Sequence, residues 1–265
     1  MDNLSLLYHS IEYIEAHLKE DITVKELSEV SRFSLYHFIR LFGSKTLFSP
    51  KDYVIRRKVC EATKLLTTSE RSVLSVALEY GFNSHETFSR AFKRVHGITP
   101  MAYKTSENSI SNMTEPISID YLSFIDHYGI IEPQPIELKN VVIYGFSILE
   151  DTFEQNTLIL YSERLNSDLV YMIRSPFDKQ VVTCYGSEVE NDYFEIHIRD
   201  GHYAKFGPVF KSAELNHLSR YITEIWLPRS GLKALDTKKK YFLIDKKTEL
   251  SYYILLPLSN NRQII

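Results

Sequence analysis

Charged and polar side chains gather on one side of the segment HETFSRAFKRVH, residues 85–96. At about 100° per helical residue, Phe88 and Phe92 point to one side of a helix. The opposite side carries Glu86, Arg90 and Lys93, with His85, Thr87 and Arg94 near them. Arginine can donate two hydrogen bonds to guanine, and glutamate can accept one from cytosine. A simpler explanation is a solvated face with an ion pair between Glu86 and Arg90.

The same pattern occurs earlier, in SRFSLYHFIRLFGSKTLFSPKDY, residues 31–53. At an offset of fifty residues, identical or similar residues recur at Ser34, Phe38, Arg40, Phe42, Ser49, Pro50 and Tyr53. The first copy turns Tyr36 and Arg40 outward, with Ile39 beside them. A basic face that occurs twice favours recognition of nucleic acid over a merely solvated surface.

Each copy is predicted to be a helix, a tight turn and a second helix. Thr23 and Glu26 form a capping box for a first helix over residues 24–30. In the second copy, Ser72 opens the first helix toward Tyr80, and Gly81 supplies the turn.

The second helix of each copy is expected to begin after a serine N-cap, Ser34 or Ser84. Between the copies, Ser49 and Pro50 start a helix of about four turns that ends near TTS, residues 67–69. Such a spacer could hold two second helices about one DNA turn apart, near 34 Å. One chain would then read two adjacent major-groove segments.

The charge distribution separates the two parts of the chain. Residues 25–104 contain 14 Lys and Arg against 7 Asp and Glu, whereas residues 108–265 contain 16 against 21. The first part suits a polyanion and the second does not. The polar, aperiodic stretch TSENSISNMTEP separates them. We therefore expect an all-α tandem helix-turn-helix (homeodomain-like) domain at 1–107, a linker at 108–116 and a second domain at 117–265.

No apolar run is long enough to cross a bilayer, and no signal peptide is recognisable, so we expect a cytoplasmic protein without a membrane partner. Cys60 and Cys184 stand alone, which argues against a disulfide framework or a structural zinc site. We expect neither a metal nor a cofactor.

The segment ALEYGFNSHETFSRAFKRVHGITPMAYK resembles the signature of the AraC/XylS transcription regulators. The matching residues are Ala77, Gly81, Phe82, Phe88, Arg90, Phe92, Gly97, Thr99, Pro100 and Tyr103. The resemblance covers about residues 5–107 and implies base contacts from Leu35, Tyr36, Ile39 and Arg40, then His85, Glu86, Thr87 and Arg90. It implies promoter DNA as a partner, with RNA polymerase as a further one.

The first copy departs from this signature twice, because Arg32 and Leu47 replace glycines of the family pattern. A left-handed backbone at either position would be strained, since both residues carry a Cβ.

In the second domain, a strand, helix, strand, strand pattern occurs twice. Strand-like segments lie at 138–148, 168–174 and 180–188, with a helical stretch around 153–166. Strands in NDYFEIHIRDGHYAKF, a helix from about Phe210 to Ile225, and the strands KKKYFLIDK and SYYILLPL follow. We expect an α+β domain of two such repeats, whose sheets can face one another and leave a cleft for a ligand.

This domain resembles the GyrI-like small-molecule-binding domains, through GHYAKFGPVF and IWLPRSG. The resemblance implies a small aromatic or apolar effector. Members of that family commonly carry a glutamate for cationic ligands in an F-E-x-Y stretch, whereas this chain has Phe242, Leu243, Ile244 and Asp245. A neutral ligand is therefore expected, unless Glu195, Glu224 or Asp245 replaces the missing charge.

The candidate ligand residues are Tyr171, Tyr203, Phe206, Trp226 and Tyr241, with Glu195 and Glu224. Core and sheet packing is the favoured explanation for any single one of these aromatics, whereas together they are consistent with an aromatic cleft.

Two other classes of function remain open at this point. GyrI-like domains include hydrolases, and Glu195, His197 and His202 lie close together in sequence. No HExxH, GxSxG or GxGxxG spacing accompanies them, so we expect no catalytic residues and no enzyme. A protein that sequesters a ligand or binds a partner without gene control is the other alternative. The prediction is a ligand-controlled, DNA-binding transcription regulator of the AraC type.

Overall fold

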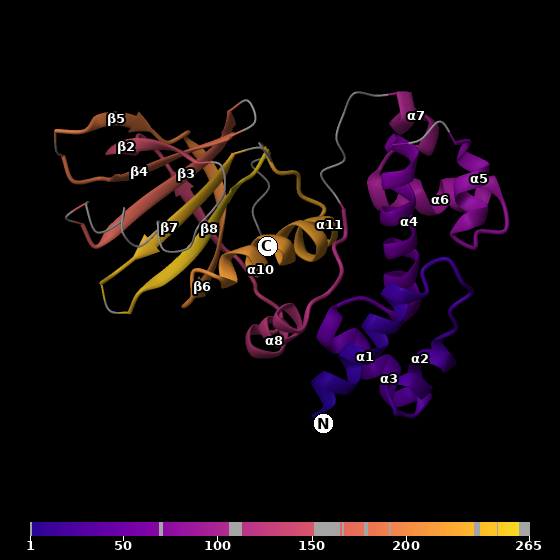
Figure 1. Ribbon diagram of the computed structural model, residues 1–265. Helices are drawn as coiled ribbons and strands as arrows, with labels where there is room; N and C mark the ends of the chain where they lie inside the picture. Colours follow the sequence, from indigo (N-terminus) through magenta and orange to yellow (C-terminus); the bar gives the residue numbers. More distant parts are fainter. Residues whose placement is uncertain are drawn as a thin grey trace. The chain divides into compact units, whose positions relative to one another are not determined.

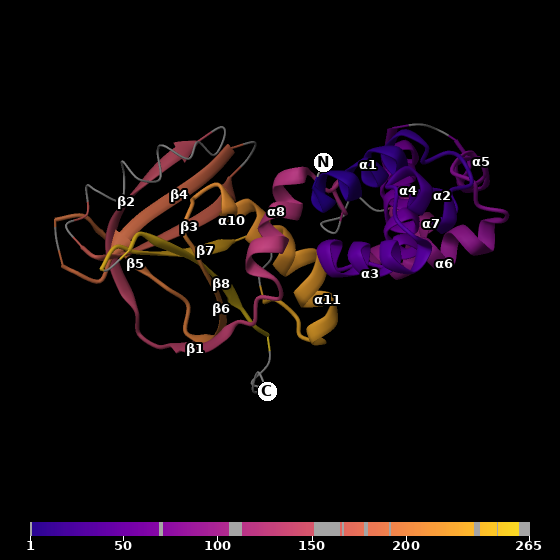
Figure 2. The same ribbon diagram turned by 90° about the horizontal axis from the view of Figure 1, so that it is seen from below.

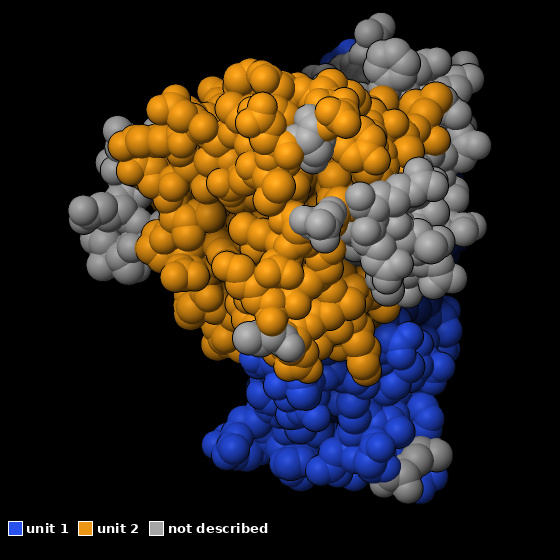
Figure 3. Space-filling model, turned by 90° about the vertical axis from the view of Figure 1, so that its left-hand side faces the viewer, with its two compact units in different colours: residues 1–129 blue, residues 130–265 orange. Residues whose placement is uncertain are grey.

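The computed structural model describes residues 2–68, 71–105, 113–150, 165, 167–177, 180–190, 192–235, 239–247 and 249–259. The chain divides into two compact units, Met1–Gly129 and Ile130–Ile265 (Figure 3). We call them the N-terminal unit and the C-terminal unit. Within the described ranges, no helix is both long enough and apolar enough to span a membrane.

The N-terminal unit is helical (Figure 1). Its helices are α1 (Asn3–Ala16), α2 (Val24–Val30), α3 (Leu35–Thr46), α4 (Pro50–Thr68), α5 (Val73–Glu79), α6 (His85–His96), α7 (Pro100–Thr105) and α8 (Ile119–Tyr128). The predicted pairs of helices are α2 with α3 and α5 with α6, and α4 is the predicted spacer. At about 1.5 Å per residue, its 19 residues span roughly 28 Å.

The predicted helix starts are confirmed. Thr23 and Glu26 form the capping box of α2. The hydroxyl oxygens of Ser34, Ser72 and Ser84 accept hydrogen bonds from the backbone N–H groups of His37, Ser75 and Thr87. Each bond satisfies a donor in the first turn that has no partner within the helix.

The two copies end their turns differently. Gly81 and Gly97 adopt a left-handed backbone, with φ of 74° and 79°. Arg32 and Leu47 occupy the corresponding places in the first copy with φ of 58° and 62°. A left-handed conformation costs a residue with a Cβ about 1–2 kcal/mol, so the strain expected from the sequence is present.

The N-terminal unit extends beyond the predicted boundary. The Tyr53 hydroxyl accepts a hydrogen bond from the Ile117 backbone N–H at 3.1 Å, and the Arg57 guanidinium donates to the Thr114 carbonyl at 2.6 Å. Helix α8 then packs against α1 and α3, and Lys45 pairs with Asp126. Residues 114–129 therefore belong to the N-terminal unit, and the C-terminal unit begins at Ile130 rather than at residue 117.

The C-terminal unit contains an antiparallel sheet and helices (Figure 1). Its strands are β1 (Gln134–Leu138), β2 (Val142–Glu150), β3 (Leu169–Phe177), β4 (Gln180–Ser187), β5 (Phe194–His197), β6 (Gly201–Val209), β7 (Lys240–Asp245) and β8 (Ser251–Pro257). The helix predicted from about Phe210 to Ile225 corresponds to α10 (Glu214–Tyr221) and the π-helix η1 (Ile222–Trp226), and α11 (Leu227–Ser230) follows beyond the predicted end. The helix predicted around 153–166 lies outside the described residues, apart from Leu165.

The strands form one sheet in the order β1-β6-β8-β7-β3-β4-β2-β5, where we expected two sheets facing one another. Strands β3 and β7 join the two predicted halves. The orders β2-β4-β3 and β6-β8-β7 match, as a duplication would require. The complete repeat stays a prediction.

The two ends of this sheet meet where the β1–β2 and β5–β6 connections lie side by side. The Asn140 backbone N–H donates to the Asp200 carboxylate at 2.8 Å, and the Ile198 N–H donates to the Val141 carbonyl at 3.0 Å. The sheet therefore curls around one of its faces, which is why a cluster of tyrosine, leucine and isoleucine side chains is buried on that face.

Candidate nucleic-acid interface and effector face

Helix α6 presents every residue that the sequence predicts for its DNA contacts. Phe88 and Phe92 are 0% exposed and anchor the helix, with ring centroids 5.7 Å apart. The exposed side carries His85, Glu86, Thr87, Arg90, Lys93 and Arg94. The helix therefore has one buried aromatic side and one charged outer side, as its spacing predicted.

Helix α3 has the same architecture with a more apolar outer side. Phe38 and Phe42 are buried, and the exposed side carries Leu35, Tyr36, Ile39 and Arg40. Tyr36 is 73% exposed. An exposed aromatic ring of this kind can contact the apolar edge of a base, such as the methyl group of thymine.

The two helices belong to the same compact unit, and both lie along one edge of it in Figure 2. Helix α4 contacts both of them. We call α3 and α6 the candidate reading helices.

Two side chains of α6 have local partners that the sequence did not reveal. Arg94 forms an ion pair with Asp52 at 3.1 Å, and Asp52 also accepts a hydrogen bond from Arg56 at 2.7 Å. Hydrogen bonds from the backbone N–H of Glu86 and from the Ser84 side chain lower the pKa of the Glu86 carboxyl. Glu86 is therefore ionised at the helix N-terminus, and Arg94 is held beside α4.

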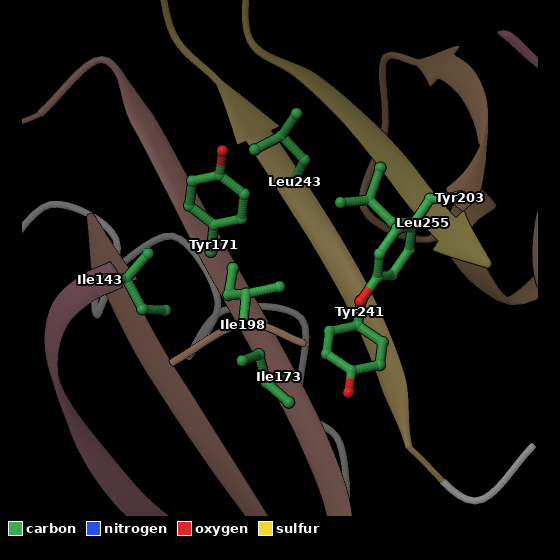
Figure 4. Close-up of a cluster of buried hydrophobic side chains, with 8 residues drawn as sticks. All are labelled: Ile143, Tyr171, Ile173, Ile198, Tyr203, Tyr241, Leu243 and Leu255. Carbon is green, nitrogen blue, oxygen red and sulfur yellow. The ribbon is translucent and has the colours of Figure 1, made fainter. Parts of the chain in front are cut away.

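The C-terminal unit brings three of the predicted ligand residues together. Tyr171, Tyr203 and Tyr241 lie on the buried face of the sheet (Figure 4). Leu243 is the register partner of Tyr171, and the rings of Tyr203 and Tyr241 meet edge to face at 5.9 Å. We call this set the tyrosine face.

Hydrogen bonds fix two of these hydroxyl groups. Tyr171 donates to the Glu188 carboxylate at 2.6 Å, and Tyr203 donates to the Arg199 carbonyl at 2.8 Å. Burial, and the nearby Tyr241 to a smaller extent, raise the pKa of Tyr203 to about 12. Both tyrosines therefore stay neutral at ordinary pH.

Phe206 and Trp226 lie apart from the tyrosine face. Their rings meet edge to face at 4.9 Å, where α10 contacts β6 and β8. Side chains alternate along a strand, so Phe206 points to the side opposite Tyr203. These two aromatics form part of the packing between the sheet and its helices.

The three candidate carboxylates also separate. Glu195 is exposed on β5 and lies 3.9 Å from His197. Glu224 accepts a hydrogen bond from Arg220 at 3.1 Å within α10 and η1. Only Asp245, the last residue of β7, shares a side of the sheet with Leu243.

Sequence reasoning missed two further residues beside the tyrosine face. The Lys205 ammonium lies 3.9 Å from the ring centroid of Tyr253, and Tyr253 is the register partner of Leu243. Burial lowers the pKa of Lys205, and Asp245 partly opposes that shift. Counting alternate residues from Tyr203 and Leu255 would have placed both side chains on this face.

Comparison with known proteins identifies the family of the N-terminal unit. Residues 27–106 match a family model described as a helix-turn-helix domain. The multiple antibiotic resistance protein MarA of Escherichia coli is 31% identical over 116 residues, which cover 43% of this chain and 91% of MarA. The chain belongs to the AraC/XylS family of helix-turn-helix regulators.

Two further proteins resemble part of this chain. The uncharacterized HTH-type transcriptional regulator YbfP of Bacillus subtilis is 35% identical over 96 residues, which are 36% of this chain and 32% of YbfP. The chain thus spans about a third of the length of that relative. The DNA-binding domain of AdpA, solved with a target DNA, is 34% identical, with a TM-score of 0.36 and coverage of 37% of this chain and 88% of that domain.

Proposed function

We propose that the protein is a transcription regulator that binds promoter DNA through α3 and α6 and is controlled by a small molecule in its C-terminal unit. RNA polymerase is its further partner. The observation that carries the first part is the outer side of α6, where six polar or charged residues are exposed on a helix held by buried aromatics. Membership of the AraC/XylS family supports the same function.

The two reading helices contribute different chemistry. In α6, Arg90 suits guanine and Glu86 suits cytosine. In α3, Leu35, Tyr36 and Ile39 suit thymine methyl groups, and Arg40 adds a charged contact. The protein would therefore recognise two unlike half-sites about one helical turn apart.

Control by an effector is proposed from the tyrosine face. Tyr171, Tyr203 and Tyr241 supply ring surface, and Leu243 puts an alkyl side chain rather than a carboxylate opposite Tyr171. Lys205, which is half-buried beside Tyr253, adds a positive charge. We propose a small aromatic or apolar effector that is neutral rather than cationic, because a cation would leave water without a matched counter-charge. The GyrI-like resemblance supports this part.

Footprinting of the full chain on its promoter tests the proposal. We expect two protected segments about one turn apart and an affinity that falls with salt, with a slope near −0.9 per neutralised phosphate. Arg40→Ala should weaken one segment and leave the other protected. Lys139→Ala removes an exposed charge from the C-terminal unit and is the matched control.

Salt-independent binding, or equal loss of both segments in Arg40→Ala, would contradict this arrangement. A complete absence of promoter binding would favour a protein that sequesters its ligand without gene control. We propose no catalysis, because Glu195 and His197 are exposed on β5 and His202 lies on β6, opposite Glu137.

A further inference from the structure

A groove of about 610 Å³ lies within the N-terminal unit. Val24 of α2 and Ile55 of α4, both partly exposed, contribute to an apolar lining, and Phe82, from the turn of the second copy, lines it as well. The groove is therefore bounded by both helix-turn-helix copies and by their spacer. Its volume falls within the range of about 300–1,000 Å³ that is typical of small-molecule sites.

Positive charge dominates the groove. Lys51 and Lys58 of α4 and Arg90 and Arg94 of α6 line it, and Asp21 is the carboxylate among the lining residues. Arg94 forms an ion pair with Asp52. The other three cations, Lys51, Lys58 and Arg90, make no ion pair in the described part of the chain. An anion in this groove would find an excess of positive charge at short range.

Lys58 is the most informative of these residues, because it is only 7% exposed. Its ammonium donates a hydrogen bond to the Glu20 carbonyl at 2.6 Å and lies under the turn at Gly81. Burial lowers the pKa of Lys58, and the charge of Asp21 opposes that shift. A buried ammonium is stabilised when an opposite charge replaces the water that it has lost.

We propose that this groove binds a small amphipathic organic anion, whose apolar part packs on Ile55 and Phe82 and whose carboxylate faces Lys58. A DNA phosphate would use the cations but would gain nothing from the apolar lining. Thr87 and Arg90 of the reading helix also line the groove, so a bound anion competes with DNA. That competition rests on the proposed function, whereas binding of the anion does not.

Calorimetry on the full chain tests the binding. The probes are 1-naphthoate and its neutral amide, 1-naphthamide. We expect naphthoate to bind at least ten-fold more tightly than the amide, and this preference should fall to about two-fold or less in Lys58→Met. Lys51→Met, at an exposed lysine, should weaken the binding of naphthoate several-fold. This variant keeps the test valid if Lys58→Met unfolds the N-terminal unit. Lys25→Met, at an exposed lysine of α2 that is not among the lining residues, is the control and should bind naphthoate as the parent does.

Naphthoate binding that is unchanged in Lys51→Met and in a folded Lys58→Met would overturn the proposal. Inorganic phosphate that binds as tightly as naphthoate would also overturn the proposal. The apolar lining would then contribute nothing, and the groove would be a binding site for phosphates of the DNA backbone. No heat of binding from naphthoate up to millimolar concentration would do the same.

A second measurement tests the competition. Fluorescence anisotropy of labelled promoter DNA should show an apparent Kd that rises in proportion to naphthoate concentration, with a smaller rise in Lys51→Met. If the protein binds no DNA at all, the proposed function fails while calorimetry still decides the groove. If DNA binds and naphthoate occupies the groove without raising the Kd, the competition is refuted.

Discussion

The two sides of α6 should respond to mutation in opposite ways. Phe92 is 0% exposed, and its ring centroid lies 5.7 Å from that of Phe88, 4.6 Å from that of His96 and 5.8 Å from that of Tyr103. Truncation of a buried aromatic to alanine costs about 3–5 kcal/mol. Phe92→Ala should therefore destabilise the second helix-turn-helix copy by about this amount.

Arg90 lies on the exposed side of the same helix. Substitutions at such positions change stability by about 0.5 kcal/mol or less. Loss of a two-bond contact to guanine instead costs about 1–3 kcal/mol of discrimination. Arg90→Ala should therefore melt as the parent protein does and bind its promoter about five- to 150-fold more weakly.

Thermal melting by circular dichroism and titration of promoter DNA separate the two effects. The weaker binding of Arg90→Ala should be accompanied by relaxed preference at one or two base pairs, which a set of single-base promoter variants detects. Lys139→Ala is the control for the loss of one exposed charge. A lower melting temperature for Arg90→Ala than for Phe92→Ala would show that the two sides of α6 have been assigned wrongly.

Three further predictions concern backbone strain, pH and the effector. Gly43→Ala should stabilise the protein by about 0.5–1 kcal/mol, because a methyl group fits at this helical position. Gly97→Ala should destabilise it by about 1 kcal/mol, because φ is 79° at Gly97. Urea unfolding measures both changes in stability. Burial acts to raise the pKa of Glu61, but the ion pairs with Lys64 and Arg57 of α4 outweigh burial and lower the pKa. The free energy of unfolding should therefore fall as the pH drops below the ordinary value of 4.5. Glu61→Gln should flatten that pH dependence. Leu243→Glu should shift the ligand preference, measured by calorimetry, from neutral toward cationic aromatic ligands. Tighter binding of the cation by the unmodified chain would contradict the proposed preference for a neutral ligand and indicate Asp245 as the counter-charge.

The helix-turn-helix copies could be predicted because their signals are local. A capping serine contacts a backbone N–H three residues along the chain, and the buried phenylalanines recur at helical spacing. Neither signal depends on the rest of the fold. This is why Ser34, Ser72 and Ser84 fall where the sequence placed them.

The end of the N-terminal unit depends on long-range contacts instead. Arg57 is 2% exposed, and its guanidinium meets Glu15, Glu61 and the Thr114 carbonyl. In the sequence, the stretch TSENSISNMTEP, residues 105–116, is polar and aperiodic, which indicates a linker. The attachment of Thr114 appears only when Arg57 of α4 is held by Glu15 of α1.

The effector residues were predicted partly from composition, which does not assign side chains to a face. Tyr203 and Phe206 both belong to β6, but they are separated by an odd number of positions and so point to opposite sides. Trp226 lies on the same side of the sheet as Phe206, because it belongs to the helical segment that packs against that side. Knowing the register would have divided the aromatics correctly and would have revealed Lys205.

The two copies of the helix-turn-helix keep one scaffold and differ in their outer chemistry. Arg32 and Leu47 hold the backbone that glycine holds in the second copy, at a cost of about 1–2 kcal/mol each. The first copy therefore keeps the backbone geometry of the second, although Arg32 and Leu47 do not favour it. Helix α3 buries its phenylalanines as α6 does. What changes is the surface, because α3 exposes Tyr36 and other apolar residues where α6 exposes charges. A repeat that keeps its geometry and varies its contacts can place two different readers on one stretch of DNA, and a single chain can then recognise an asymmetric site.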